Sequence, residues 1–185
     1  LDRPNPLGGA AVAGFVLEPA QTSFVGQYPI PVMHGLTVGE LARMIKGEGW
    51  LPGLEALDLT VVPVESWQRT QLWPTTGLPW VPPSPNIPDV ETAFVYPGTC
   101  FFEATGASEG RGTREPFRLL GAPWADGQAL ADTLNARALP GVRFTPAQFT
   151  PEPIEGMSAQ PKLEGEALEG IRLHVTAPAA YRPVA

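Results

Sequence analysis

The frequency of proline and glycine is the feature that most limits how this chain can fold. Its 185 residues include 23 prolines and 20 glycines, and the proline share is more than twice the average of globular proteins. Because proline lacks an amide donor and clashes inside helices, long helices and central strands are excluded from much of the chain. The prolines and glycines lie between apolar segments and form no repeats, so the sequence predicts an ordered, loop-rich globular domain.

Composition and charge exclude several classes of function. Hydrophobic residues make up 43% of the chain, enough to form the core of one domain. The net charge is -7, with 12 basic residues against 19 acidic ones, and no basic cluster is present to bind the phosphates of a nucleic acid. No apolar run approaches the ~20 residues that span a bilayer, and the N-terminal LDRPNPLGG has no targeting pattern. We therefore expect no nucleic acid partner and no membrane span.

Motifs for metals, nucleotides and serine hydrolysis are missing or incomplete. The single cysteine, Cys100, has no His or Cys neighbour at ligand spacing, so no metal site is expected. Neither the Walker loop nor G-x-G-x-x-G occurs, so no cofactor is expected. Residues 106–110 fit G-x-S-x-G, but the Gly-Arg-Gly-Thr that follows is a poor start for the required helix. We therefore reject the serine-hydrolase interpretation.

Local patterns predict two well-marked helices and several short elements. Thr37 and Glu40 have the spacing of a capping box, which predicts a helix over residues 38–46. Asp126 can cap a second helix that runs to about Arg137, and residues 90–95 favour a short helix that ends before Pro97. Strands are expected at residues 12–17, 22–25, 57–64, 117–120 and 171–175, with an ordered loop at 73–89. These elements predict an α+β or mixed α/β fold, a single loop-rich domain over residues 1–185 with a mixed sheet and a few helices.

The segment from Pro82 to Phe117 is the strongest candidate for a site. Polar side chains gather there around three glycines, whose backbone can turn sharply and approach a ligand closely. The polar residues are Glu103, Ser108, Glu109, Arg111 and Thr113, and the glycines are Gly106, Gly110 and Gly112. This density predicts the ordered wall of a cleft.

Six blocks in order along the chain carry a family resemblance. They are LDRPNPLGG, SFVGQYPIPVMHGLTVGELARM, WPTTGLPWVPPSPNIPD, YPGTCFFEATGASEGRGTREPF, GAPWAD and GIRLHVT. Together they resemble the exo-β-N-acetylmuramidase family (NamZ type), long known only as a bacterial domain of unknown function. Two positions depart from the family pattern, because Ala104 and Gly106 stand where a Gly and an Asn are typical.

The resemblance implies both an activity and a missing partner. It implies a glycoside hydrolase that removes non-reducing-end N-acetylmuramic acid from a peptidoglycan-derived muropeptide or disaccharide, in the cell envelope (periplasm) or outside the cell. It also implies that residues 1–185 correspond to a second, C-terminal lobe, with residues 1–10 as the inter-lobe linker. The missing N-terminal lobe is Rossmann-like in the family and carries a Pro-Glu-His-Gly motif, which this chain lacks. We therefore expect the isolated chain to be folded but inert.

The chemistry of glycosidic cleavage suggests roles for individual residues. Hydrolysis normally takes two carboxyl groups, and Glu103 and Glu109 are the candidates on this chain. A guanidinium can hold the lactyl carboxylate of muramic acid, which suits Arg111, and an aromatic wall against the N-acetyl group suits Trp80. Further candidate contacts to the sugar are His34, Tyr96 and Ser108.

Structural roles and other functions remain open at this point. Glu109 and Arg111 can simply pair with each other, Glu103 can be a buried carboxylate held by backbone donors, and His34 and Tyr96 can tie down loops. A non-catalytic peptidoglycan- or sugar-binding module is the alternative to an enzyme, supported by Trp73 and Trp80 in a proline-stiffened loop. A purely structural or dimerising domain is the third class.

Overall fold

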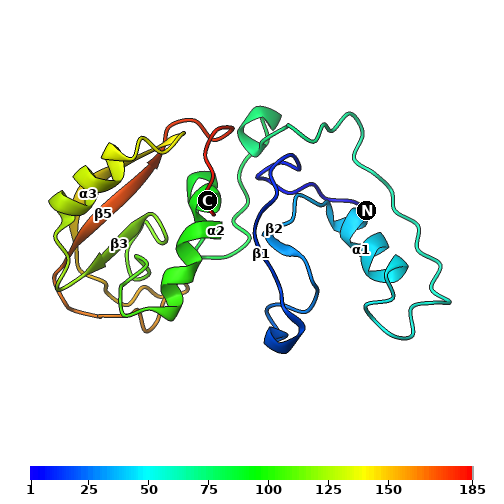
Figure 1. The fold of residues 1–185 in the computed structure, drawn as a ribbon, viewed down its shortest axis with the longest axis horizontal. Coiled ribbons are helices and arrows are strands. Elements are labelled where there is room, and N and C mark those ends of the chain that lie inside the picture. Colours follow the sequence, from blue (N-terminus) through cyan, green and yellow to red (C-terminus); the bar gives the residue numbers. More distant parts are fainter. Residues whose placement is uncertain (185) are drawn as a thin grey trace. The chain divides into compact units, whose positions relative to one another are not determined.

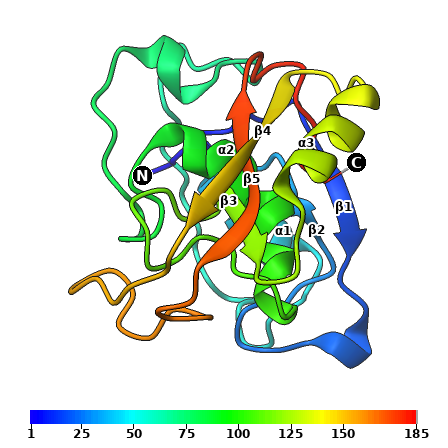
Figure 2. The ribbon, with the colours of Figure 1, turned by 90° about the vertical axis from the view of Figure 1, so that its left-hand side faces the viewer.

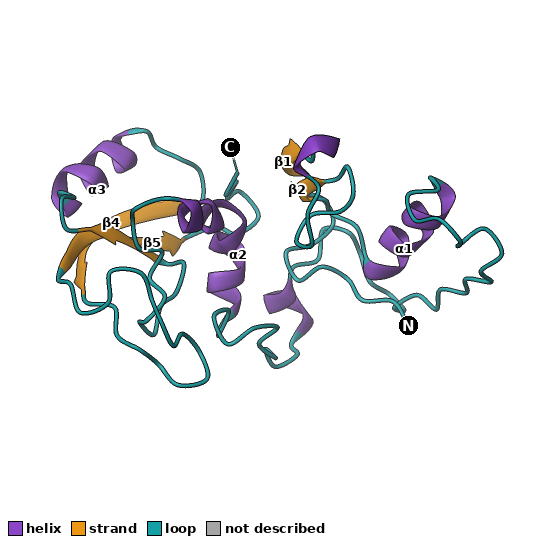
Figure 3. Cartoon of the chain, turned by 90° about the horizontal axis from the view of Figure 1, so that it is seen from below, coloured by secondary structure: helices purple, strands orange, loops and turns teal. Residues whose placement is uncertain are grey.

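The computed structural model describes residues 1–184, and it divides them into two compact units. The first unit comprises residues 1–78 and the second residues 79–184. The first contains the strands β1 (Ala13–Val16) and β2 (Pro31–Met33) and the helix α1 (Val38–Gly47) (Figure 1). The second contains the helices α2 (Val90–Thr99) and α3 (Gly127–Ala136) and the strands β3 (Leu119–Ala122), β4 (Val142–Phe149) and β5 (Leu168–Val175). Loops make up much of both units, as Figure 3 shows, in agreement with the abundance of proline.

Helix α1 (Val38–Gly47) forms as its capping box predicts. The hydroxyl of Thr37 accepts from the amide of Glu40 at 3.1 Å, and the Glu40 carboxylate accepts from the amide of Thr37 at 2.9 Å. The carboxylate of Asp2 adds a third contact, because its Oδ1 accepts from the amide of Gly39 at 2.7 Å. These bonds satisfy amides that the first turn leaves without partners, and they fix the N-terminal segment against the helix.

Of the strands predicted for the first unit, the one at residues 12–17 is confirmed by β1, and the other two are wrong. β1 (Ala13–Val16) and β2 (Pro31–Met33) form an antiparallel pair, and the short helix η1 (Pro19–Gln21) lies between them. The strand expected at residues 22–25 is wrong, since only a bridge between Ser23 and Gly26 forms there. The strand expected at residues 57–64 is also wrong. That segment runs as a loop and pairs with the N-terminal segment, where the amide of Asp2 donates to the carbonyl of Val62.

The first unit buries very little apolar surface. Within residues 1–78, all of which the structure describes, Met33 is the one large apolar side chain that is buried. Phe15, Phe24 and Val25 are among the large apolar side chains that remain exposed. The capped helix, the hairpin and loop hydrogen bonds therefore hold this unit together more than a core does.

The second unit is built on an antiparallel sheet with the order β3–β5–β4. β3 (Leu119–Ala122) and β4 (Val142–Phe149) flank β5 (Leu168–Val175). Both sheets of the chain are antiparallel, so the expected mixed sheet did not form, whereas the α+β class is confirmed. The sequence did not predict β4 because Pro146 interrupts its pattern. The proline is tolerated because β4 lies at an edge of the sheet, where a missing amide donor breaks no necessary hydrogen bond.

Two helices complete the core of the second unit. α2 (Val90–Thr99) contributes Val95 and α3 (Gly127–Ala136) contributes Ala131 to a cluster with Phe117 and with the apolar side chains of the three strands. Figure 2 shows α3 alongside β4 and β5, with which it is in contact. Asp126 caps α3 as predicted, since its side chain accepts from the amide of Ala129 at 2.9 Å.

Helix α2 runs further than its sequence suggests. It continues through Pro97 to Thr99, and a 3-10 turn, η3 (Cys100–Ala104), follows directly. The hydroxyl of Thr99 donates to the carbonyl of Val95 at 3.0 Å, which adds a bond in the turn that contains the proline. The predicted end before Pro97 is therefore wrong, and the consequence is that Glu103 is carried on a helical turn. No helix within residues 1–184 has the length and apolar character needed to cross a bilayer.

Candidate active site

A tight glycine turn presents Arg111 in the second unit. Gly110 and Gly112 flank it with φ values of 79° and 80°, a region that side-chain-bearing residues rarely adopt. A Cβ on Gly112 would lie only 2.6 Å from the Cβ of Pro161 and 2.8 Å from the carbonyl oxygen of Glu152. Glycine is therefore required at this position both by the backbone angle and by the close approach of residues 152–161.

Alternating charges connect four side chains at this turn. Arg111 Nη2 donates to Glu103 Oε1 at 2.5 Å, and Arg111 Nε lies 3.7 Å from Glu109 Oε1. On its other side Glu109 Oε2 lies 2.7 Å from Lys162 Nζ. Two carboxylates and two cations balance, so this cluster of Glu103, Arg111, Glu109 and Lys162 carries no net charge when all four are ionised.

Exposure separates the two candidate carboxylates. The side chains of Glu103 and Arg111 are 37% and 35% exposed, whereas that of Glu109 is 3% exposed. A ligand can therefore reach Glu103 and Arg111 directly, while Glu109 lies behind them between two cations. The geometry favours the structural alternative for Glu109, and its catalytic role stays a prediction.

Aromatic rings lie next to the guanidinium of Arg111. Arg111 Cζ lies 5.2 Å from the ring centroid of Phe117, and Tyr96 meets the same ring edge-on at 4.8 Å. Phe117 is almost fully buried and has a φ of 63°, a conformation that costs roughly 1–3 kcal/mol and is found most often at functional sites. Burial raises the pKa of Tyr96, and the nearby Cys100 and Glu103 raise it further, so its phenol stays protonated and able to donate. Tyr96 therefore lies beside the cluster, and its contact with a sugar stays a prediction.

Ser108 is fixed inside the fold and does not face solvent. Its amide donates to the carbonyl of Gly121 at 2.8 Å, and its carbonyl accepts from the amide of Gly121 at 3.1 Å. Its hydroxyl accepts from the amide of Gly110 at 3.1 Å. The side chain is completely buried. Direct contact with a sugar would require this bridge to open, so the geometry favours a structural role for Ser108.

Trp80 and His34 have local roles in loops. Trp80 Nε1 donates to the carbonyl of Ile87 at 3.2 Å, which tethers the proline-rich loop of the second unit. His34 lies in the first unit, where its Nδ1 accepts from the amide of Leu36 at 3.1 Å and burial lowers its pKa. These bonds give each residue a role in its own loop, and their roles in sugar binding stay predictions.

Lys162 is the residue that sequence reasoning missed. It lies more than fifty residues after the glycine turn, in a loop between Ile154 and Leu168 that has no pattern of its own. Its ammonium group pairs with Glu109 and donates to backbone carbonyls of residues 102–107. Only the folded chain brings these groups together, and no local signal in the sequence indicates it.

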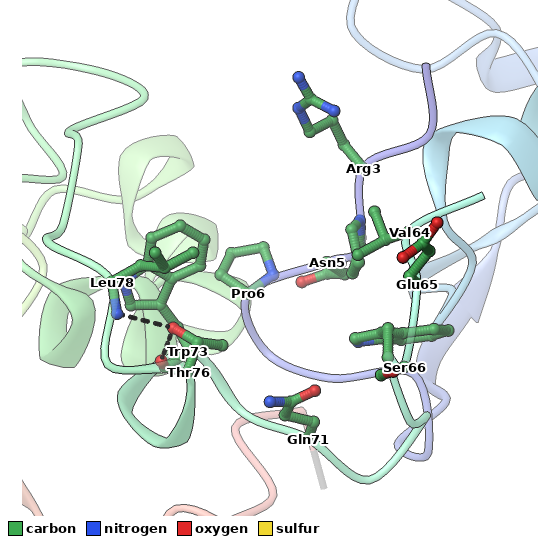
Figure 4. Close-up of a pocket in the computed structure, with 12 residues that line it drawn as sticks. Arg3, Asn5, Pro6, Val64, Glu65, Ser66, Gln71, Trp73, Thr76 and Leu78 are labelled. Carbon is green, nitrogen blue, oxygen red and sulfur yellow. Dashed lines mark hydrogen bonds between the residues drawn. The ribbon is translucent and has the colours of Figure 1, made fainter. Parts of the chain in front are cut away.

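The first unit contains a separate pocket with a volume of about 460 Å³ (Figure 4). Trp67 and Trp73 line it together with proline rings and the polar side chains of Asn5 and Gln71. Ser66, also in the lining, has a φ of 61°. The two tryptophans form part of the wall of a concave surface. No group of three or more His, Cys, Asp or Glu suited to a metal ion occurs in residues 1–184.

Comparison with known proteins gives one consistent family. The N-terminal part of the family described as exo-beta-N-acetylmuramidase NamZ matches residues 1–91, and its C-terminal part matches residues 94–185. Sequence alone placed all of residues 1–185 in the second lobe, whereas the first match assigns residues 1–91 to the N-terminal part. The two matches meet at residues 91–94, at the start of α2, whereas the structural units divide between residues 78 and 79.

Three relatives of this chain are each more than twice as long as the part that they share with it. The peptidoglycan beta-N-acetylmuramidase NamZ of Bacillus subtilis (strain 168) is 48% identical over 176 residues, which are 95% of this chain and 40% of that protein. A DUF1343 family protein from Bacteroides fragilis NCTC 9343 has a crystal structure that matches with a TM-score of 0.89 and 38% identity, over 100% of this chain and 46% of that one. A second from the same organism matches with a TM-score of 0.74 and 35% identity, over 93% and 42%. The chain thus spans less than half the length of these relatives, and it belongs to the exo-β-N-acetylmuramidase NamZ family.

Proposed function

We propose that this chain is part of a glycoside hydrolase that removes N-acetylmuramic acid from the non-reducing end of peptidoglycan fragments. The relative from Bacillus subtilis, 48% identical, bears the name of that activity. The observation that carries the proposal is the exposed pair of Glu103 and Arg111. Arg111 lies on a turn whose glycines, Gly110 and Gly112, cannot be replaced without strain. One group is suited to acid–base chemistry and the other to binding a carboxylate.

Arg111 recognises the lactyl carboxylate, the group by which N-acetylmuramic acid differs from N-acetylglucosamine. A guanidinium has five N–H donors, and the hydrogen bond to Glu103 engages only Nη2. Because the four-residue cluster is neutral and the chain as a whole carries -7, long-range attraction does not favour an anionic sugar. Selectivity therefore depends on direct charge-assisted hydrogen bonds from Arg111.

Glu103 is the carboxylate that the second unit offers to the reaction. Two carboxyl groups are normally required, and the burial of Glu109 between Arg111 and Lys162 leaves it poorly placed as the second. We assign the second carboxylate to a part of the enzyme outside residues 1–185, the lobe whose Pro-Glu-His-Gly motif the family resemblance implies. Residues 1–185 alone then bind a sugar weakly and do not hydrolyse it.

Hydrolysis of a chromogenic N-acetylmuramide tests these roles. In the full-length enzyme Glu103→Gln should lower kcat by about 10²–10⁴-fold without changing the melting temperature. Glu109→Gln should lower the melting temperature, because it removes the buried partner of Lys162. The isolated chain should show no turnover. A Glu103→Gln enzyme with normal kcat would remove Glu103 from catalysis, and turnover by the isolated chain would place the whole site within it.

A sugar-binding module is the second candidate, and the pocket of the first unit favours it. Indole rings beside amide side chains are suited to a sugar ring, whose apolar face stacks while its hydroxyls form hydrogen bonds. Binding of the muramyl-glucosamine disaccharide to the 185-residue chain tests this candidate. The titration compares Trp73→Leu, which changes the wall of the pocket, with Trp124→Leu, a control at an exposed tryptophan. Binding that is lost only in Trp73→Leu and survives Glu103→Gln and Arg111→Ala favours the module. No binding at all favours a structural or dimerising domain.

Location and partner follow from the proposed substrate. Peptidoglycan fragments arise in the bacterial envelope, so we place the protein in the periplasm or outside the cell, with the remainder of the enzyme as the partner of this chain. Fractionation of cells that produce the full-length protein tests the location, and recovery in the cytoplasmic fraction would contradict it.

A further inference from the structure

The ammonium group of Lys162 lies among five oxygen atoms of one short segment. Four are the backbone carbonyls of Phe102, Glu103, Thr105 and Ala107, at 2.7, 3.4, 3.2 and 2.6 Å from Nζ. The fifth is a side-chain oxygen, Oε2 of Glu109, at 2.7 Å. All five therefore belong to residues 102–109, the segment that carries Glu103 and leads into the glycine turn.

Carbonyl dipoles that converge on one point repel each other unless a cation lies between them. Carbonyl and carboxylate oxygens are also the ligands that hard cations prefer. Other bonds also hold this segment. Residues 100–104 form the 3-10 turn η3, Thr105 donates to the carbonyl of Phe102 through its amide at 3.0 Å and its hydroxyl at 2.8 Å, and Ser108 bridges to β3. The positive charge of Lys162 adds contacts with four carbonyls, which include those of Thr105 and Ala107 beyond the end of η3.

The chemistry of the group explains why a lysine stands here. The chain has ten arginines and two lysines, Lys46 and Lys162. An ammonium is a compact point charge with three rotatable donors, whereas a guanidinium is planar and has a fixed fork of donors. Five oxygens around one nitrogen suit the first geometry and exclude the second.

The loop that carries Lys162 is fixed independently of the ammonium group. Pro161 is buried against Gly112, and Leu163 adopts a φ of 55°. The amide of Gly165 donates to the carbonyl of Pro151 at 2.9 Å, and the amide of Glu152 donates to the carbonyl of Gly112 at 2.9 Å. The position of the charge is therefore set by the fold around it.

We propose that Lys162 is a positioning residue of the site: its ammonium occupies the place of a bound monovalent cation and holds residues 102–109 in the shape that brings Glu103 to Arg111. The catalytic consequence rests on the proposed function, whereas the ordering of the segment does not. Lys162 acts through the backbone and through Glu109, and touches neither reacting atom of the substrate.

Chemical rescue in the full-length protein tests this inference. Lys162→Ala leaves a space lined by five oxygens, so the rate of amide hydrogen exchange in residues 102–110 should rise about tenfold or more. Added ammonium or potassium ions should reverse this rise by filling the space, whereas tetramethylammonium, which is too large, should not. Lys162→Arg keeps the charge and should still fail to restore slow exchange. Lys46→Ala is the matched control, because that lysine donates to the single carbonyl of Leu57 in the first unit.

Activity provides the second measurement. Lys162→Ala should lower kcat on a chromogenic N-acetylmuramide about as much as Glu103→Gln does, and ammonium should restore part of it. Three results for Lys162→Ala would each overturn the inference. They are amide exchange as slow as in the wild type, fast exchange that neither ammonium nor potassium slows, and fast exchange together with a normal kcat. If Lys162→Ala does not fold, slow exchange with normal kcat in Lys162→Arg would overturn it equally. A wild-type enzyme without activity on muramides would instead refute the proposed function, while the exchange results still judge the role of Lys162.

Discussion

Replacing Gly112 by alanine should destabilise the second unit by an amount that the structure allows to be worked out. The backbone at this position has a φ of 80°, and a left-handed conformation costs a residue with a side chain roughly 1–2 kcal/mol. The added Cβ would also lie 2.6 and 2.7 Å from two ring carbons of Pro161 and 2.8 Å from the carbonyl oxygen of Glu152. Overpacking of this kind costs typically about 1–3 kcal/mol, so the total is roughly 2–5 kcal/mol.

Calorimetry of the 185-residue chain measures this loss against a control from the same segment. For a chain of this size about 2–4 °C of melting temperature is lost per kcal/mol, so the Gly112→Ala transition should fall by roughly 4–20 °C. Gly106→Ala is the control, since no atom lies within 4 Å of its added Cβ and its φ is not positive; it should change stability by less than about 0.5 kcal/mol. Equal melting temperatures for the two variants would refute the steric reasoning and the close packing of Pro161 on the turn.

Three further predictions concern stability and its dependence on pH. Thr37→Ala removes half of the capping box of α1 and should cost about 0.5–2 kcal/mol of unfolding free energy in urea titrations, whereas Thr37→Ser should cost little. The amide of Gly39 is the chief cause that lowers the pKa of Asp2, and Arg69 is the chief cause that lowers the pKa of Glu40. The two carboxylates therefore stabilise the fold above their ordinary pKa values of 3.8 and 4.5, and this stabilisation is lost as the pH falls through their lower pKa values in the folded state. Thermal melts between pH 7 and 2 should show a smaller loss of stability in acid for Asp2→Asn than for the unchanged chain. Burial raises the pKa of Tyr181 to about 12 from 10.0, so stability should decline as the pH rises from about 10 through 12; melts of Tyr181→Phe that decline equally would contradict this cause.

The features that sequence predicted are those specified by residues close together in the chain. The capping box of Thr37 and Glu40 and the cap at Asp126 each need only a three-residue spacing, and both helices formed where expected. The sequence also suggested that Arg111 could pair with Glu109, and Arg111 Nε lies 3.7 Å from Glu109 Oε1. The shorter contact, between Arg111 and Glu103, joins residues eight positions apart, and the sequence did not suggest it.

Features that depend on distant partners could not be predicted. Residues 57–64 have the composition of a buried strand but pair with the N-terminal segment as a loop. Trp124 has a large apolar side chain, yet it is 79% exposed. Lys162 reaches the site only because Pro161 packs on Gly112, a contact between segments about fifty residues apart. Whether an apolar or charged side chain finds such a partner is decided by tertiary packing, which no local pattern encodes.

The central claim is that Arg111 recognises the lactyl carboxylate of N-acetylmuramic acid. The most direct test measures the affinity of the full-length enzyme for N-acetylmuramic acid and for N-acetylglucosamine by isothermal titration. The same two affinities are then measured for Arg111→Ala. A hydrogen bond to a charged group contributes about 1.5–3 kcal/mol, so the variant should bind N-acetylmuramic acid at least about tenfold more weakly and N-acetylglucosamine almost unchanged. Equal losses of affinity for the two sugars would contradict the assignment of Arg111.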